Sequence, residues 1–93
     1  MTIITTEVKI NETTYGFRFP VGRIIMLERE IGKPISQLSR DMSGLVTLIK
    51  YSTQKAGKYL TASEFEDFLD NIDANDLAVC AEAVNKVMSN GKN

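Results

Sequence analysis

The segment from Arg23 to Pro34 constrains the fold most, because it predicts an amphipathic helix together with the end of that helix. Its apolar positions recur at helical spacing with charged residues between them: Ile24, Leu27 and Ile31. Gly32 can take the left-handed conformation that often follows a helix, and Pro34 cannot continue the same helix. We therefore expect a short helix over residues 21–31.

Before this helix the sequence predicts a β-hairpin. Apolar and polar positions alternate over residues 3–10 and again over residues 13–19, and Asn11-Glu12 between them is a plausible tight turn. Three aromatic side chains share one face of the second strand: Tyr15, Phe17 and Phe19. Because an isolated hairpin is marginal in water, we expect this aromatic face to lie in the core.

After the first helix, the periodicity predicts four more. Their expected ranges are 34–40, 44–56, 62–71 and 76–89. Asp41 or Ser43 is a candidate cap for the helix at 44–56, and Gly57 is a natural stop for it.

Two cap signals mark the later helices. Thr61 and Glu64 have the spacing of a capping box, and the segment from Asp73 to Asp76 resembles a turn followed by a new N-cap. The predicted fold class is therefore α+β, with an N-terminal antiparallel β-hairpin packed on a bundle of four to five short α-helices.

Length and composition favour one soluble domain. The 93 residues are predicted to form a single domain, with the hairpin at 1–19, a helical part at 20–89 and a flexible tail at 90–93. The single cysteine, Cys80, excludes an intramolecular disulfide and favours a reducing compartment. The first residues lack a signal-peptide pattern, and no apolar run approaches the roughly 20 residues of a membrane span. We expect a cytoplasmic protein that does not contact a membrane.

The residue types argue against catalysis. The chain has no histidine, which removes the usual general base near neutral pH and the commonest metal ligand. Cys80 falls on the apolar face of a predicted helix, where a structural role is expected. The stretch from Asp70 to Asp76 fails the calcium-loop pattern, since Ala78 stands where that loop needs glycine. The sequence predicts no enzyme activity, no catalytic residue, no cofactor and no metal.

Charge is distributed unevenly along the chain. Residues 1–60 carry nine Lys/Arg against five Asp/Glu, whereas residues 61–93 carry two against seven. The acidic part is interpreted either as a solvated face near helix N-termini or as a surface that pairs with a basic partner, including the basic end of another copy. The net charge of −1 and the lack of a basic stripe along any helix argue against nucleic acid as a partner.

Protein binding remains the favoured function. Met26 lies off the main apolar stripe of the first helix, and tyrosines after residue 50 are amphipathic enough to anchor a partner. The candidate partner-binding residues are Met26, Arg29, Lys50, Tyr51, Lys55 and Tyr59.

In its order of elements the chain resembles the tail assembly chaperones of long-tailed bacteriophages and prophages of Gram-positive bacteria. The resemblance is carried by a strand, Tyr15-Gly-Phe-Arg-Phe19, and by three later segments. These segments are Leu27-Glu-Arg-Glu-Ile-Gly-Lys-Pro-Ile35, Leu45-Val-Thr-Leu-Ile-Lys50 and Leu60-Thr-Ala-Ser-Glu-Phe-Glu-Asp-Phe-Leu-Asp70. An amphipathic C-terminal helix completes the order.

The resemblance implies a non-catalytic protein of the host cytoplasm that keeps the phage tape-measure protein soluble and is absent from the finished virion. It also implies self-association and the tail-tube protein as a further partner. A longer form made by ribosomal frameshifting near Gly91-Lys-Asn93 is a related hypothesis. Two alternatives stay open: a head–tail or virion adaptor protein, and a small nucleic-acid-binding regulator.

Overall fold

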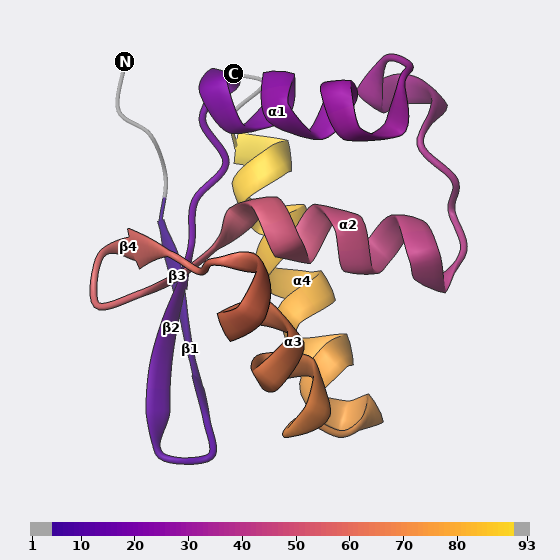
Figure 1. The fold of residues 1–93 in the computed structure, drawn as a ribbon. Coiled ribbons are helices and arrows are strands. Elements are labelled where there is room, and N and C mark those ends of the chain that lie inside the picture. Colours follow the sequence, from indigo (N-terminus) through magenta and orange to yellow (C-terminus); the bar gives the residue numbers. More distant parts are fainter. Residues whose placement is uncertain (1–4, 91–93) are drawn as a thin grey trace.

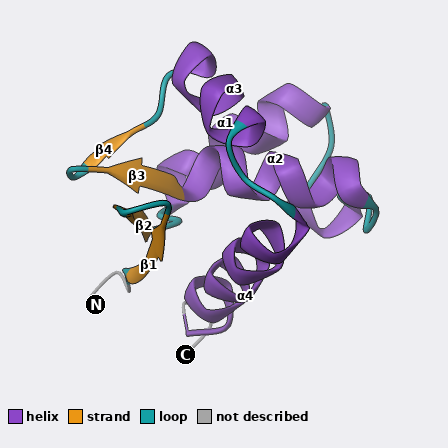
Figure 2. Cartoon of the chain, turned by 90° about the horizontal axis from the view of Figure 1, so that it is seen from below, coloured by secondary structure: helices purple, strands orange, loops and turns teal. Residues whose placement is uncertain are grey.

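A computed structural model describes residues 5–90 of the chain. A four-stranded antiparallel sheet, in the order β1-β2-β3-β4, lies on one side of the molecule and the helices gather on the other (Figures 1 and 2). The predicted α+β class and the N-terminal hairpin are therefore confirmed, with four α-helices and one short 3₁₀ turn. Within the described residues, no helix is both long and apolar enough to cross a membrane.

The N-terminal hairpin consists of β1 (Thr6–Ile10) and β2 (Thr13–Phe17). Asn11 and Glu12 both have positive φ, at 50° and 68°, as a two-residue type I′ turn requires. The second strand is shorter than predicted because the chain turns toward Pro20, which lacks a main-chain donor. Residues 3 and 4 of the predicted first strand lie outside the described residues.

The first two helical predictions differ in outcome. Helix α1 (Val21–Ile31) has its predicted bounds, and Gly32 ends it with φ 71° while its N–H donates to the Glu28 carbonyl at 2.8 Å. The predicted helix at 34–40 is wrong in length, since only Ile35–Gln37 forms a 3₁₀ turn, η1. Leu38 is already extended, at φ −62° and ψ 136°, so the helix cannot continue.

Helix α2 (Met42–Ser52) corrects the predicted range of 44–56. Asp41 is its N-cap and accepts a hydrogen bond from the Gly44 N–H at 3.1 Å. The helix ends five residues before Gly57 because Thr53 turns extended and its hydroxyl donates to the Ile49 carbonyl at 2.6 Å. Local side-chain bonds of this kind compete with helix continuation, and threonine favours strand geometry.

A second hairpin, which the sequence analysis missed, follows α2 without a loop. It consists of β3 (Thr53–Lys55) and β4 (Lys58–Tyr59), and β3 pairs with β2. Ala56 and Gly57, at φ 54° and 78°, form the turn. Gly57 is thus a turn residue and does not stop a helix.

Helices α3 (Ala62–Asp70) and α4 (Ala74–Asn90) complete the fold. The predicted capping box is present, with Thr61 and Glu64 exchanging bonds of 2.9 and 3.2 Å. The helix predicted at 76–89 starts two residues earlier, because the Asp73 carboxylate accepts from the Asp76 N–H at 2.9 Å. Residues 91–93 of the predicted tail, including the segment of the frameshift hypothesis, lie outside the described residues.

The core forms where the sheet meets α2, α3 and α4. Phe17 and Phe19 are buried as predicted, and Tyr15 packs against the same cluster. The Tyr15 ring meets the Phe68 ring edge-on with 4.9 Å between centroids. The remaining core residues are mostly aliphatic: Ile10, Leu27, Ile49, Ala83, Val84 and Val87, together with Phe65 and Cys80.

Candidate functional site

An arginine stacked between two tyrosines ties α1 to α2 and β4. The Arg23 guanidinium lies 4.0 Å from the centroid of the Tyr59 ring and 5.2 Å from that of the Tyr51 ring. Its Nε also donates to the Tyr51 carbonyl at 2.9 Å, and the Tyr59 hydroxyl donates to the Arg18 carbonyl at 3.1 Å. Cation–π contacts of this geometry are worth about 0.5–1 kcal/mol where they are exposed. Arg23 therefore joins three elements that are distant in sequence.

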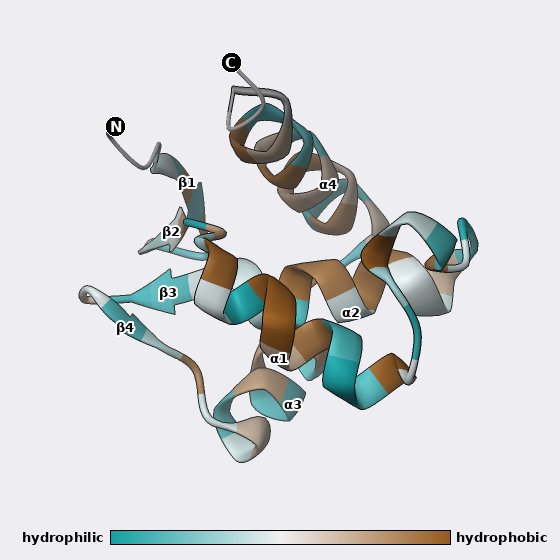
Figure 3. Ribbon diagram, turned by 90° about the horizontal axis from the view of Figure 1, so that it is seen from above, coloured by the Kyte–Doolittle hydropathy of each residue, from teal (hydrophilic) through white to brown (hydrophobic). Residues whose placement is uncertain are grey.

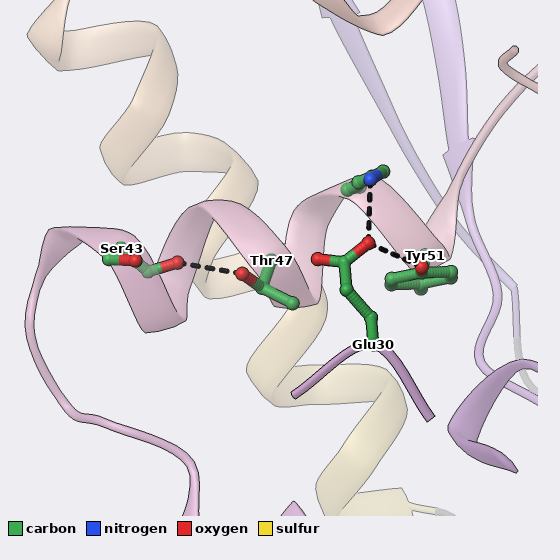
Figure 4. Close-up of polar contacts among 5 residues, drawn as sticks. Glu30, Ser43, Thr47 and Tyr51 are labelled. Atoms are coloured by element: carbon green, nitrogen blue, oxygen red, sulfur yellow. Dashed lines mark hydrogen bonds and ion pairs between the residues drawn. The ribbon is translucent and has the colours of Figure 1, made fainter. Parts of the chain in front are cut away.

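A second polar cluster lies about two turns further along α1 and shares Tyr51 with the first (Figure 4). Glu30 on α1 accepts from the Lys50 ammonium at 2.7 Å and from the Tyr51 hydroxyl at 2.6 Å. These two hydrogen bonds, with that of Lys50 the larger cause, lower the pKa of the Glu30 carboxyl. Burial, and then the bond to Glu30, raise the pKa of Tyr51 to about 12. Glu30 therefore links α1 to α2 through Lys50 and Tyr51.

Three of the six candidate partner-binding residues therefore join different elements, and a fourth, Met26, accepts a hydrogen bond at its sulfur from Arg23 on the same helix at 3.4 Å. Lys50, Tyr51 and Tyr59 hold α1 against α2 and β4 through Arg23 and Glu30. Those two partners are not evident from the sequence, because an arginine and a glutamate between the apolar positions of an amphipathic helix are typical of solvated charges. The residues that they contact lie on α2 and β4, so no local sequence signal indicates these contacts.

The other three candidates are exposed, and they lie in two places. Met26, with 45% of its surface exposed, and Arg29 lie on the outer side of α1. Lys55 lies on β3, beside α3 rather than on a helix face as predicted. The structure thus groups Met26 with Arg29 and separates both from Lys55.

Met26 belongs to an apolar strip that the sequence analysis only partly identified. We call Val21, Ile25 and Met26, which are 68%, 44% and 45% exposed, the α1 strip. Helix α1 lies on top of the molecule, and its first turns are among the most hydrophobic parts of the ribbon seen from above (Figure 3). Val21, Ile25 and Arg29 follow one another at spacings of four residues and are neighbours on the helix surface, whereas Met26 lies about 100° further round the helix from Ile25.

Within residues 5–90, shallow grooves lie on both sides of α3. One, of about 390 Å³, runs along α2 between Glu30 and the start of α3, and Met42, 61% exposed, stands at its wall. The other, of about 340 Å³, lies between β3 and α3 and carries Lys55 with Glu64 and Asp67. Both grooves mix charged and apolar side chains.

The cysteine and two of the acidic residues have structural roles. Burial, and then the charge of Asp76, raise the pKa of the Cys80 thiol to about 11, which leaves little thiolate at neutral pH. Glu64 and Asp76 belong to the helix caps. Among residues 5–90, no three Cys, Asp or Glu side chains are placed to hold a metal ion.

Comparison with known proteins identifies no family. No family model, curated protein or solved structure matches the chain. Function must therefore be inferred from the surface and from the residue patterns themselves.

The Glu30 cluster leads to a pH-dependent prediction. Because the pKa of Glu30 is lowered from 4.5, its contribution is complete above that value and is lost as the pH falls through the native pKa. Glu30→Gln is expected to lower the free energy of unfolding at about pH 7 by less than about 1 kcal/mol, since the pair is partly exposed. Urea titrations toward pH 3 should show the difference from the wild type shrinking.

The matched control is Glu82→Gln on α4, whose carboxylate makes no ion pair or side-chain hydrogen bond among the described residues. This variant should follow the wild type throughout the titration. A constant offset between Glu30→Gln and the wild type across the acid range would contradict the assigned role of Glu30.

Proposed function

We propose that this protein is a non-catalytic chaperone that binds the tape-measure protein of a long-tailed phage and keeps it soluble during assembly of the tail tube. The order of its hairpin and helices supports the proposal, since the resemblance rests on that order. The observation that carries it is the α1 strip, three large apolar side chains that helix α1 leaves exposed.

The α1 strip suits a helical client. Tape-measure proteins are long and largely helical, and an amphipathic helix associates by laying its apolar side on an apolar surface. The strip is short, so one copy holds the client weakly, but many copies along a long client would retain it strongly. Weak individual contacts also allow stepwise release as the tube grows.

Arg29 lies beside the α1 strip and would help to orient the bound client. It is exposed, and within the described residues it makes no ion pair or side-chain hydrogen bond. A charge at the rim of an apolar contact chiefly affects encounter rate and register, with little effect on affinity. Arg29 is therefore assigned to positioning of the client.

The proposal predicts that Ile25→Asp combined with Met26→Asp weakens binding of the tape-measure protein at least about tenfold. Each side chain has about half of its surface left to bury, so losing both removes on the order of 1.4 kcal/mol or more. Co-expression followed by affinity purification and quantification of the retained tape-measure protein measures the loss.

Val79→Asp is the matched control, because Val79 is 41% exposed but lies on α4. It should bind like the wild type. Tyr51→Ala is a poor probe, since it also removes the contacts to Arg23 and Glu30. Unchanged binding by a folded Ile25→Asp, Met26→Asp variant would reject the α1 strip as the client site.

Two outcomes would replace the proposed function. Recovery of the protein from purified virions, in fixed copy number, would indicate a head–tail or virion adaptor. A DNA mobility shift that falls steeply with salt would indicate a nucleic-acid-binding regulator.

A further inference from the structure

Gly22 lies in the first turn of α1, at a position where neither the backbone nor the packing requires a glycine. Its φ is not positive, unlike those of Gly32 and Gly57, so an ordinary residue could adopt the same helical conformation. A Cβ at Gly22 would meet nothing within 4 Å among the described residues. Since glycine is a poorer helix former than alanine, the missing side chain is unfavourable for α1 itself. It indicates space that is kept open on the surface of the helix.

Gly22 is one corner of a four-residue hole on the surface of α1. Residues that lie three, four and seven positions apart on a helix enclose a depression into which a side chain of a facing helix can insert. Four exposed residues of α1 have this spacing: Gly22, Ile25, Met26 and Arg29. The centre of the hole lies about 150° round the helix from Leu27, the fully buried residue of α1. Because one corner carries no side chain, the hole is deeper than four side chains would leave it.

The Met26 side of the hole is held in place by contacts that reach other elements. The Met26 sulfur accepts a hydrogen bond from Nη1 of Arg23 at 3.4 Å. The same guanidinium lies 4.0 Å from the centroid of the Tyr59 ring, and its Nε donates to the Tyr51 carbonyl at 2.9 Å. A methionine side chain is otherwise flexible. These contacts fix one wall of the hole before a partner binds, so less conformational entropy is lost on binding.

Given the client binding proposed above, we propose that a helix of the client inserts one large aliphatic side chain into this hole, over Gly22, and carries an acidic residue about one turn from it. Ile25 and Met26, 44% and 45% exposed, supply apolar walls for the inserted side chain. Arg29 closes the far end, and in the part of the chain that the structure describes it makes no ion pair. Charge complementarity therefore favours a carboxylate on the client. Residues three or four positions from the inserted one lie on the same side of the client helix, within reach of Arg29.

Filling the hole tests the proposal. Gly22→Leu places a side chain where that of the client would lie, and we expect a loss of about tenfold or more in the tape-measure protein retained after co-expression. The smaller substitution Gly22→Ala should cause a smaller loss. Neither variant should lower the midpoint of thermal unfolding, because a Cβ at this position meets no neighbour. Weaker binding without weaker folding distinguishes a contact with the client from a structural role.

Ser63→Leu is the matched control, because Ser63 is also the exposed second residue of a helix, α3. This variant should retain the client like the wild type. Wild-type binding by Gly22→Leu, or an equal loss in Ser63→Leu, overturns the proposal. So does a Gly22→Leu variant that keeps its client but no longer self-associates in sedimentation equilibrium, since the hole would then hold a second copy. If Gly22→Leu binds normally while the Ile25→Asp, Met26→Asp variant does not, only the hole is rejected and the proposed function stands.

Charge reversal at Arg29 tests the acidic residue of the client. Arg29→Glu should lower the amount of retained tape-measure protein at low salt, because it places like charges next to each other. The difference from the wild type should shrink at high salt, since both groups are exposed to solvent and are screened. Unchanged or increased retention at low salt overturns the assignment of an acidic client helix.

Discussion

Phe17→Ala is expected to cost about 3–5 kcal/mol of the free energy of unfolding, a large part of the total for a domain of this size. The Phe17 side chain is 0% exposed and lies at the centre of the core, on the strand that pairs with both β1 and β3. Alanine would leave a cavity between sheet and helices that neither layer can close. Urea denaturation followed by circular dichroism measures the loss.

Val21→Ala is the control for this prediction. It removes apolar atoms from a residue that is 68% exposed, so the free energy of unfolding should change by about 0.5 kcal/mol or less. A loss below about 1.5 kcal/mol for Phe17→Ala would mean that the core can collapse around the missing ring, which contradicts the packing described here.

Gly44→Ala is expected to destabilise the protein by about 3 kcal/mol, although alanine is the best helix former. A Cβ at Gly44 would overlap the Ser39 carbonyl oxygen and lie 2.8 Å from the Ser39 carbonyl carbon. Both atoms are main chain and cannot rotate away. The start of α2 or the segment before it must shift, which also disturbs the Asp41 cap.

Gly22→Ala provides the matched comparison. Gly22 also lies in the first turn of a helix, but a Cβ there meets nothing within 4 Å. This substitution should stabilise the protein by about 0.5 kcal/mol. Thermal unfolding of the two variants side by side should move the midpoints in opposite directions. Movement in the same direction would refute the close approach at Gly44.

Most of the helical framework followed from local sequence. Spacing of apolar residues and the Gly32 stop predicted α1, and the Thr61–Glu64 box predicted the start of α3. Each of these signals depends on residues within one or two helical turns of each other. They therefore predict the helix without knowledge of the tertiary structure. The aromatic face of β2 was likewise predictable from alternation.

The second hairpin could not be predicted in the same way. Residues 53–56 fell within the helix predicted at 44–56, and Ala56-Gly57 is a weaker turn signal than Asn-Gly. Their strand conformation depends on β2, which lies 36 residues or more away in sequence. The same applies to the candidate site. Exposure of Met26 followed from its place on one helix, whereas the roles of Arg23 and Glu30 depend on how two helices face each other.

The direct passage from α2 into β3 has a consequence for how the molecule moves. The helix ends at Ser52 and the strand begins at Thr53, and both side chains are fully buried and hydrogen-bonded to carbonyls of α2. Without an intervening loop there is no hinge at which the sheet could swing relative to this helix. Sheet and central helix therefore open or close to solvent as a single cooperative unit.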